Sequence, residues 1–252
     1  TFAGNCLGHS RPSSTIAKCE HGYQCETDEQ VKGHKLKIDR NITRIMKADD
    51  FGMIYHAFSN SLGNCVALKI SQLTDQLEQG INREIEILKY FNNKVMYERN
   101  NIIKMITNQK KRENNQQKMF IILELAGKDV MDYMFHTVRD LGRNYVPKTN
   151  QEIVTKIIKG AALALEQFHQ HGIHSNVNSD NFLTSDLEPN LNLDIINCKL
   201  IDFNISVLTD RDGTIISKGS VDIGYIPSWN RAPEIQSIIG GASSSSTNQG
   251  IF

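Results

Sequence analysis

Two short stretches in the second half of the chain carry most of the information about its fold: His174-Ser-Asn-Val-Asn-Ser-Asp-Asn-Phe-Leu183 and Leu200-Ile-Asp-Phe-Asn204. Both combine apolar residues with polar loop residues, which is typical of short strands joined by long loops. Upstream of them, residues 151–170 repeat apolar side chains at helical spacing and predict a long helix. These side chains are Ile153, Ile157, Ala161, Leu165 and Phe168.

The first half of the chain carries the pattern of strands. Four short apolar segments are bounded by polar residues. Residues 108–118, between the last two segments, are wholly polar and predict the exposed tip of a hairpin. Between the second and third segments, residues 75–91 repeat apolar side chains at helical spacing and predict an amphipathic helix. The expected strands are residues 53–57, 65–70, 102–106 and 119–123.

The order of strands, one helix, more strands and a helical half resembles that of a two-lobed protein kinase. Short motifs occur in the family's order across about residues 40–236, and the chain is identified as a member of the protein kinase superfamily. They are Ala67-Leu-Lys-Ile70 for the Val-Ala-Ile-Lys strand, Arg83-Glu-Ile85 for the next helix, residues 174–183 for the catalytic loop, residues 200–204 for the metal-binding turn, and Trp229-Asn-Arg-Ala-Pro-Glu234 for the end of the activation segment. The resemblance implies an α+β fold, with an N-lobe of antiparallel sheet plus one helix and a helical C-lobe. The subfamily stays open between the dual-specificity branch near the cyclin-dependent kinases and casein-kinase-like members.

The resemblance implies ATP and Mg²⁺ as cofactors and gives individual residues a role. Lys69 would hold the α- and β-phosphates, and Glu84 would align this lysine through an ion pair. Asn181 and Asp202 would bind the metal, because amide and carboxylate oxygens are ligands suited to Mg²⁺. The other nucleotide contacts that the family implies are Gly52, Ala67, Glu124 and Ala126.

The catalytic loop departs from the family at the positions that perform the chemistry. Asn176 stands where family members have the proton-accepting aspartate, and an amide does not act as a base near neutral pH. Loss of general-base catalysis commonly lowers the rate about 10²- to 10⁴-fold. Asn178 replaces the lysine that steadies the transferred phosphate, and Ser175 replaces the arginine that binds a phosphorylated activation loop.

The glycine-rich loop of the family is also altered. In residues 47–54 only the last glycine, Gly52, is kept, and Lys47 and Asp49 occupy the first two glycine positions. Side chains at these positions obstruct the approach of backbone N–H groups to the phosphates. The carboxylates of Asp49 and Asp50 would also repel a polyanion. We therefore expect weak nucleotide binding.

These kept and lost residues leave two functions open. The first is a catalytically impaired pseudokinase that acts on a protein partner as a regulatory or scaffolding module with weak ATP binding. The alternative is an unorthodox active kinase that transfers the ATP γ-phosphate to Ser/Thr side chains of a protein substrate.

Composition shifts predict four segments. Residues 1–35 form a polar leader, residues 36–125 an N-lobe, residues 126–236 a partial C-lobe and residues 237–252 a flexible serine-rich tail. The chain starts at Thr1 and ends soon after the Ala-Pro-Glu motif, whereas the family's C-lobe continues with further helices. A fragment or a truncated C-lobe is expected.

Five cysteines are too few for a fold built on disulfides. Cys6, Cys19 and Cys25 lie near His9 and His21, so this leader could bind zinc, form a disulfide or remain unstructured. Two further cysteines, Cys65 and Cys198, occur in apolar runs and are predicted to be ordinary buried thiols.

The 28 basic and 28 acidic side chains balance, so charge gives no argument for binding nucleic acid or an anionic membrane. No apolar run approaches the roughly 18 residues that span a bilayer. A cytoplasmic protein is expected, and the cysteine cluster leaves secretion open.

Overall fold

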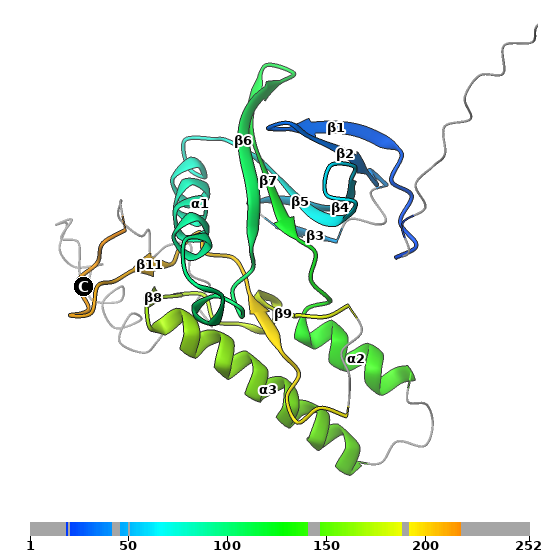
Figure 1. Ribbon diagram of the computed structural model, residues 1–252, viewed down its shortest axis with the longest axis vertical. Coiled ribbons are helices and arrows are strands. Elements are labelled where there is room, and N and C mark those ends of the chain that lie inside the picture. The colour runs from blue at the N-terminus through cyan, green and yellow to red at the C-terminus, as the bar shows by residue number, and fades with distance from the viewer. Residues whose placement is uncertain are drawn as a thin grey trace, which may run out of the picture.

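The computed structural model describes residue 19 and residues 21–41, 46–49, 51–140, 147–187 and 192–217. A curled antiparallel sheet and helix α1 (Glu78–Asn92) form one half, and helices α2 (Val130–Asp140) and α3 (Pro147–His169) lie in the other (Figure 1). This arrangement confirms the predicted α+β kinase-like fold. The strands of the large sheet are β1 (Thr27–Val31), β2 (His34–Ile38), β3 (Lys47–Asp49), β4 (Gly52–Ser59), β5 (Asn64–Gln72), β6 (Met105–Glu113) and β7 (Gln116–Glu124).

The seven-stranded sheet runs in the order β1-β2-β4-β5-β7-β6, with β3 paired to β4. The central strand β5 is buried on both faces from Val66 to Ser71. Such a strand needs a cover on each side. On one face, Val66, Leu68 and Ile70 pack against the β1–β2 hairpin, and the other face is turned toward α1 and the second half. Because β1 begins at Thr27, part of the predicted leader is folded into the sheet.

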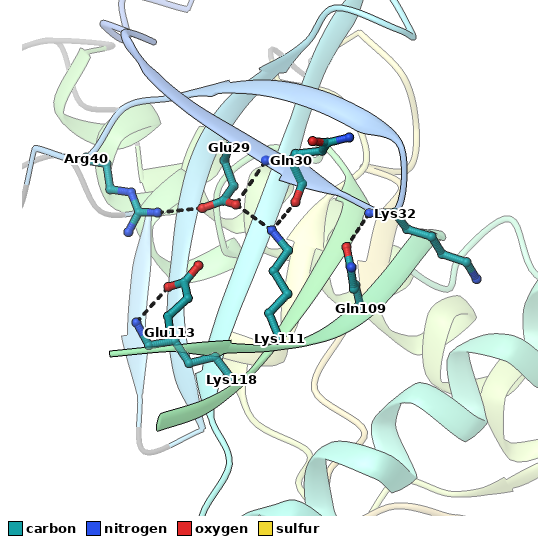
Figure 2. Close-up of polar contacts among 8 residues, drawn as sticks. All are labelled: Glu29, Gln30, Lys32, Arg40, Gln109, Lys111, Glu113 and Lys118. Carbon is teal, nitrogen blue, oxygen red and sulfur yellow. Dashed lines mark hydrogen bonds and ion pairs between the residues drawn. The ribbon is translucent and has the colours of Figure 1, made fainter. Parts of the chain in front are cut away.

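Side chains join β1 to β6, the two ends of the strand order. The carboxylate of Glu29 accepts from Lys111 Nζ at 2.7 Å and from Arg40 Nη2 at 3.0 Å. The same Lys111 amine donates to the backbone oxygen of Gln30 and lies 4.5 Å from the ring centroid of Phe120. This network closes the curled sheet over the apolar core that lies between the β1–β2 hairpin and β5. Figure 2 draws Glu29, Gln30, Lys32, Arg40, Gln109, Lys111, Glu113 and Lys118.

The second half is held to the first by a shared core. Phe91 of α1 and Phe168 of α3 have ring centroids 5.4 Å apart, and Phe168 stacks on Phe203 at 5.1 Å. Helix α3 approaches its neighbours closely at Gly160, where an added Cβ would lie 1.8 Å from Ile196 O. Short elements complete this half: the 3-10 helices η2 (Met96–Glu98) and η3 (Ser179–Asn181), and the strands β8 (Gly172–Ile173), β9 (Phe182–Thr184), β10 (Cys198–Leu200) and β11 (Val207–Leu208).

Two predicted segments differ from the structure. Residues 108–118 form the predicted hairpin, but most of them are paired in β6 and β7, and only Asn114 and Asn115, with φ of 51° and 62°, form its turn. Such positive φ values belong to the tight turn that suits a twisted hairpin. Strand β6 begins at Met105, and Ile102 and Ile103 pair instead with Leu200 of β10. The polar composition of β6 is accounted for by its contacts with β1.

Several predicted features lie outside the described residues: Asp50, Cys6, His9, the motif at 229–234 and the serine-rich tail at 237–252. In the ranges that the structure describes, no helix combines the length and apolar character needed to cross a membrane.

Candidate functional site

A cleft of about 1000 Å³ lies between the large sheet and the second half. Strands β3, β4 and β5 form one wall, β7 and the segment that follows it form the back, and residues of the 180–183 and 201–202 segments form the opposite wall. The volume is at the upper end of that found for small-molecule sites. Six residues predicted from the sequence line this cleft: Ala67, Lys69, Glu84, Glu124, Ala126 and Asp202.

An ion pair joins β5 to α1 inside the cleft. Lys69 Nζ lies 2.7 Å from Glu84 Oε2, and each residue is only 3% exposed. The face of β5 that carries Lys69 is the face turned toward α1. The helix is fixed in place by buried apolar residues and by Arg83, whose Nη1 donates to Asn204 O at 3.0 Å. Charges this deeply buried are stable only as a pair.

The loop after β8 holds a chain of amide side chains. Asn178 Nδ2 donates to Asn176 Oδ1 at 3.0 Å, and Asn176 Nδ2 donates to Asp202 Oδ2 at 3.3 Å. Asn181 Nδ2 donates to Asn176 O at 2.8 Å. The structure therefore brings together the four predicted residues Asn176, Asn178, Asn181 and Asp202.

Asp202 has an unusual backbone and an unpaired oxygen. Its φ is +67°, in the left-handed region, which is strained for a residue with a side chain. Its Oδ1 is buried and has no hydrogen-bond partner among the described residues. The neighbours on both sides hold the turn, because Ile201 N donates to Asn181 O at 3.0 Å and Phe203 is stacked in the shared core. A strained turn with an unpaired carboxylate oxygen, on a residue that lines a cleft, is a feature of ligand sites.

His174 fixes the start of the loop. It is fully buried, its Nε2 donates to Ile201 O at 3.0 Å, and Asn176 N donates to its Nδ1 at 3.3 Å. Ser206 Oγ donates to His174 O at 2.7 Å. Burial lowers the pKa of His174, and its contact with Ile201 O and the charge of Asp202 oppose this effect. The neutral ring, with its proton on Nε2, is the form that makes both hydrogen bonds.

The β3–β4 hairpin lies over the cleft. Lys47 pairs with Ile54 and Asp49 with Gly52, so the altered glycine positions lie on β3. Lys47 Nζ donates to Asp180 O at 3.2 Å, a contact between the hairpin and the opposite wall. Phe51 is partly buried against the shared core beside Gly80 of α1. The hairpin therefore lies closed on the cleft.

The family of the chain can be stated at this point. A sequence model described as "Protein kinase domain" matches residues 48–247, most of the chain. The chain belongs to the protein kinase superfamily. No curated protein matches it at a significant level.

Protein kinases as a class use ATP and Mg²⁺. The residues of this kinase domain fit the ion, because the unpaired Oδ1 of Asp202 and the amide oxygen of Asn181 are hard oxygen donors on two segments that are hydrogen-bonded to each other. They fit the nucleotide less well. Lys47 and Asp49, which the family resemblance assigns to the first two glycine positions of the phosphate-binding loop, lie on β3.

Two predicted nucleotide contacts also have a structural role in this kinase domain. Gly52 has φ +145°, and an added Cβ would lie 2.5 Å from Ile70 O, so glycine allows β4 to approach β5. Glu124 pairs with Lys199 Nζ at 2.9 Å and accepts from Lys104 N at 2.9 Å, which orders the segment that leaves β7.

Sequence reasoning missed other residues of the cleft. Asp129 and Asp132 line it, and Asp129 Oδ1 accepts from the backbone N–H of Asp132 at 2.9 Å at the start of α2. An aspartate of this kind is a recognised helix-start signal and would have predicted α2. His21 and Tyr23 also line the cleft, and no local pattern connects them with it.

Proposed function

We propose that this chain is a pseudokinase: a regulatory or scaffolding protein kinase domain that binds ATP weakly and transfers phosphate poorly or not at all. The observation that carries the proposal is the bonding of Asn176. This residue occupies the position of the general base, its amide nitrogen donates to Asp202, and its amide oxygen accepts from Asn178.

The hydrogen-bonded amides of this loop explain why Asn176 and Asn178 do not take over the role of the missing general base. A general base must accept a proton from the substrate hydroxyl, within hydrogen-bond reach. At this position Asn176 offers a neutral amide whose oxygen is already used by Asn178. Asn178 in turn does not supply the positive charge that steadies the transferred phosphate in active kinases. The loop is thus stable as a structure and poorly equipped for transfer.

Nucleotide binding is supported by some residues and opposed by others. Lys69, aligned by Glu84, supplies the positive charge for phosphates, and Asp202 with Asn181 would hold Mg²⁺. When bound, the ion would neutralise phosphate charge. The carboxylate of Asp49 opposes this binding. We expect affinity in the high-micromolar range or weaker, a binding free energy of roughly −5 kcal/mol.

One observation favours the alternative, an active Ser/Thr kinase. The pair between Lys69 and Glu84 is closed at 2.7 Å, and protein kinases need this pair for transfer. An active enzyme would act on a protein substrate, and a pseudokinase would act on a protein partner.

Phosphate transfer separates the two functions. Purified chain is incubated with γ-labelled ATP, Mg²⁺ and a mixture of Ser/Thr peptides, beside Lys69→Ala, Asn176→Asp and the double variant Asn176→Asp/Asn178→Lys. We expect the unmodified chain to match Lys69→Ala, and the double variant to exceed Asn176→Asp. Transfer by the unmodified chain that Lys69→Ala abolishes would establish the alternative.

A further inference from the structure

A second group of reactive side chains lies outside the amide loop, where the segment before β1 meets β4 and β5 of the large sheet. Cys19, His21, His56 and Cys65 each direct one ligand atom to a common point, and these atoms all lie within 4.8 Å of one another. Two of these residues belong to the leader, and the remaining two lie on β4 and β5. The sequence places Cys19 and His21 near Cys6, His9 and Cys25. The structure instead brings Cys19 and His21 together with His56 and Cys65, which are distant in the chain.

The topology of the sheet brings the second pair together. His56 is registered opposite Ala67, and Cys65 is registered opposite Phe58. Partners in this register share a face, so His56 and Cys65 are diagonal neighbours on one face of the β4–β5 hairpin. Diagonal neighbours are close enough for an imidazole and a thiol to share one ligand. The leader crosses this face and adds its own Cys and His.

Four of the six separations between the ligand atoms are close to those of a tetrahedral zinc site. Zinc bonds of about 2.3 Å to sulfur and about 2.0–2.1 Å to nitrogen place neighbouring ligand atoms about 3.3–3.8 Å apart. Here Cys19 Sγ lies 3.2 Å from Cys65 Sγ, 3.2 Å from His21 Nδ1 and 3.3 Å from His56 Nε2. His21 Nδ1 lies 3.4 Å from His56 Nε2.

A disulfide and a purely hydrogen-bonded cluster both fit the group less well than a metal ion does. Cys19 and Cys65 do not form a disulfide, because their sulfur atoms are 3.2 Å apart and an S–S bond is only about 2.05 Å long. A cluster held only by hydrogen bonds would be weak, because a thiol is a poor donor and a poor acceptor. One divalent ion satisfies all four groups at once, and two thiolates with two imidazoles form a ligand set that zinc takes in structural sites.

Neighbouring residues hold one ligand ring in the orientation that zinc binding needs. Cys25 Sγ lies 3.4 Å from Nδ1 of His56, the nitrogen that does not face the cluster. The ring of Tyr23 stacks on His56 with centroids 4.2 Å apart and an angle of 3° between the planes. Histidines that bind metal usually have such an outer partner on their second nitrogen. Cys25 thus supports the site from outside and is not one of its four ligands.

We propose that Cys19, His21, His56 and Cys65 bind a structural zinc ion that fastens the leader to the β4–β5 hairpin. Four protein ligands close the site, so it holds no open position for catalysis. His21 is exposed and Cys65 is half-buried, so the ion can enter from solvent. Because His21 and Tyr23 also line the cleft, zinc would shape one wall of the nucleotide site.

Metal analysis and cobalt substitution test the proposal on the full chain. The chain is purified without chelators, and its zinc content is measured by inductively coupled plasma mass spectrometry. We expect about one zinc per chain, as for a closed structural site. After chelation and addition of Co²⁺, we expect the visible absorption of tetrahedral cobalt together with thiolate-to-cobalt charge transfer. A folded chain that binds neither ion, or that shows the weak spectrum of six-coordinate cobalt, would overturn the proposal.

Matched variants separate ligands from neighbours. Cys65→Ser should lose the zinc and the charge-transfer band, and His21→Ala, at an exposed position, should alter both without unfolding the chain. Cys25→Ser should keep one zinc with affinity lowered about 10- to 100-fold, as for an outer partner. Cys198→Ser, remote from the site, should change neither. Circular dichroism confirms folding of each variant. Full zinc content in both Cys65→Ser and His21→Ala, or a native Cys19–Cys65 disulfide in peptide mass maps, would refute the assignment.

Discussion

Replacing Asn176 by aspartate introduces the residue that the family resemblance predicts for this position, and we expect it to destabilise the chain in the absence of metal. Asn176 Nδ2 now donates to Asp202 Oδ2 across 3.3 Å. The variant Asn176→Asp would exchange this hydrogen bond for two carboxylates at about the same separation. The lost hydrogen bond to a charged group contributes about 1.5–3 kcal/mol.

The repulsion can be estimated from the same distance. Two unit charges 3.3 Å apart repel by about 5 kcal/mol at an effective dielectric constant of 20. Asp202 is only partly buried, so solvent reduces this value. Protonation of the introduced carboxyl would remove the repulsion altogether. At pH 7 this protonation costs about 4 kcal/mol for an aspartate with the ordinary pKa of about 3.9, so the repulsion cannot exceed that value. We expect a net loss of about 2–4 kcal/mol, and a fall in Tm of about 2–4 °C per kcal/mol for a chain of this size.

Thermal unfolding with and without Mg²⁺ and ATP measures the effect. The ion should stabilise Asn176→Asp more than it stabilises the unmodified chain, because it relieves the repulsion at Asp202. Val177→Asp is the control, since it adds the same charge at an exposed position of the same loop. An Asn176→Asp chain as stable as the unmodified chain in chelator, or one that Mg²⁺ stabilises no further, would refute the reasoning. The variant should also transfer little phosphate, because single repairs in a group that acts as a unit recover little.

Three further predictions test other parts of the site. Lys69→Ala removes the cation that pairs with Glu84, so the free energy of unfolding should fall by about 3–5 kcal/mol in denaturant titrations. The rise in Tm that ATP and Mg²⁺ produce should also vanish. A rise that persists would contradict the role of Lys69. Asp49→Gly with Asp50→Ser should enlarge that rise in scanning fluorimetry, because it removes two negative charges near the phosphates; an unchanged rise would show that these charges do not limit binding. Burial lowers the pKa of His174, so the folded chain keeps this ring neutral while the unfolded chain protonates it below about pH 6.5. Its contribution to stability is therefore present above that pH and is lost as the pH falls toward the lowered pKa; His174→Gln should show a shallower dependence in denaturant titrations, and an equally steep one would assign the effect to other groups.

The kinase fold could be predicted because its motifs lie on elements that the family always uses. Lys69 sits on a strand with apolar neighbours on both sides, and Glu84 sits on a helix of regular spacing, so both their types and their order were readable. The sequence predicted strand β5 but not its uninterrupted burial from Val66 to Ser71, because Lys69 and Ser71 are polar. The sequence did not indicate that the β1–β2 hairpin covers the face of β5 turned away from α1. Strand β1 is largely polar and is held partly by charged side chains such as Glu29.

The cysteine and histidine cluster shows a different limit of sequence reasoning. Cys19 and His21 are separated from His56 and Cys65 by a long stretch of chain, and only the register of β4 against β5 brings the second pair to one face. Local spacing matches no common zinc motif in such a case. The same limit applies to Asn176, since the sequence predicted a lost base at this position and only the structure shows the hydrogen bonds that this side chain makes.

The bonding of the loop also bears on why a pseudokinase of the kind we propose would keep this site. In an active kinase, the base and the metal ligands carry charges that ligands must balance. Here Asn176 donates a hydrogen bond to Asp202 and accepts one from Asn178, and His174 and Phe203 tie the same turn to the core. In the pseudokinase that we propose, we expect the arrangement of the two lobes to depend less on nucleotide than it would with the family's residues. A domain that presents one fixed surface to a partner needs that independence, and an enzyme that opens and closes in each cycle does not.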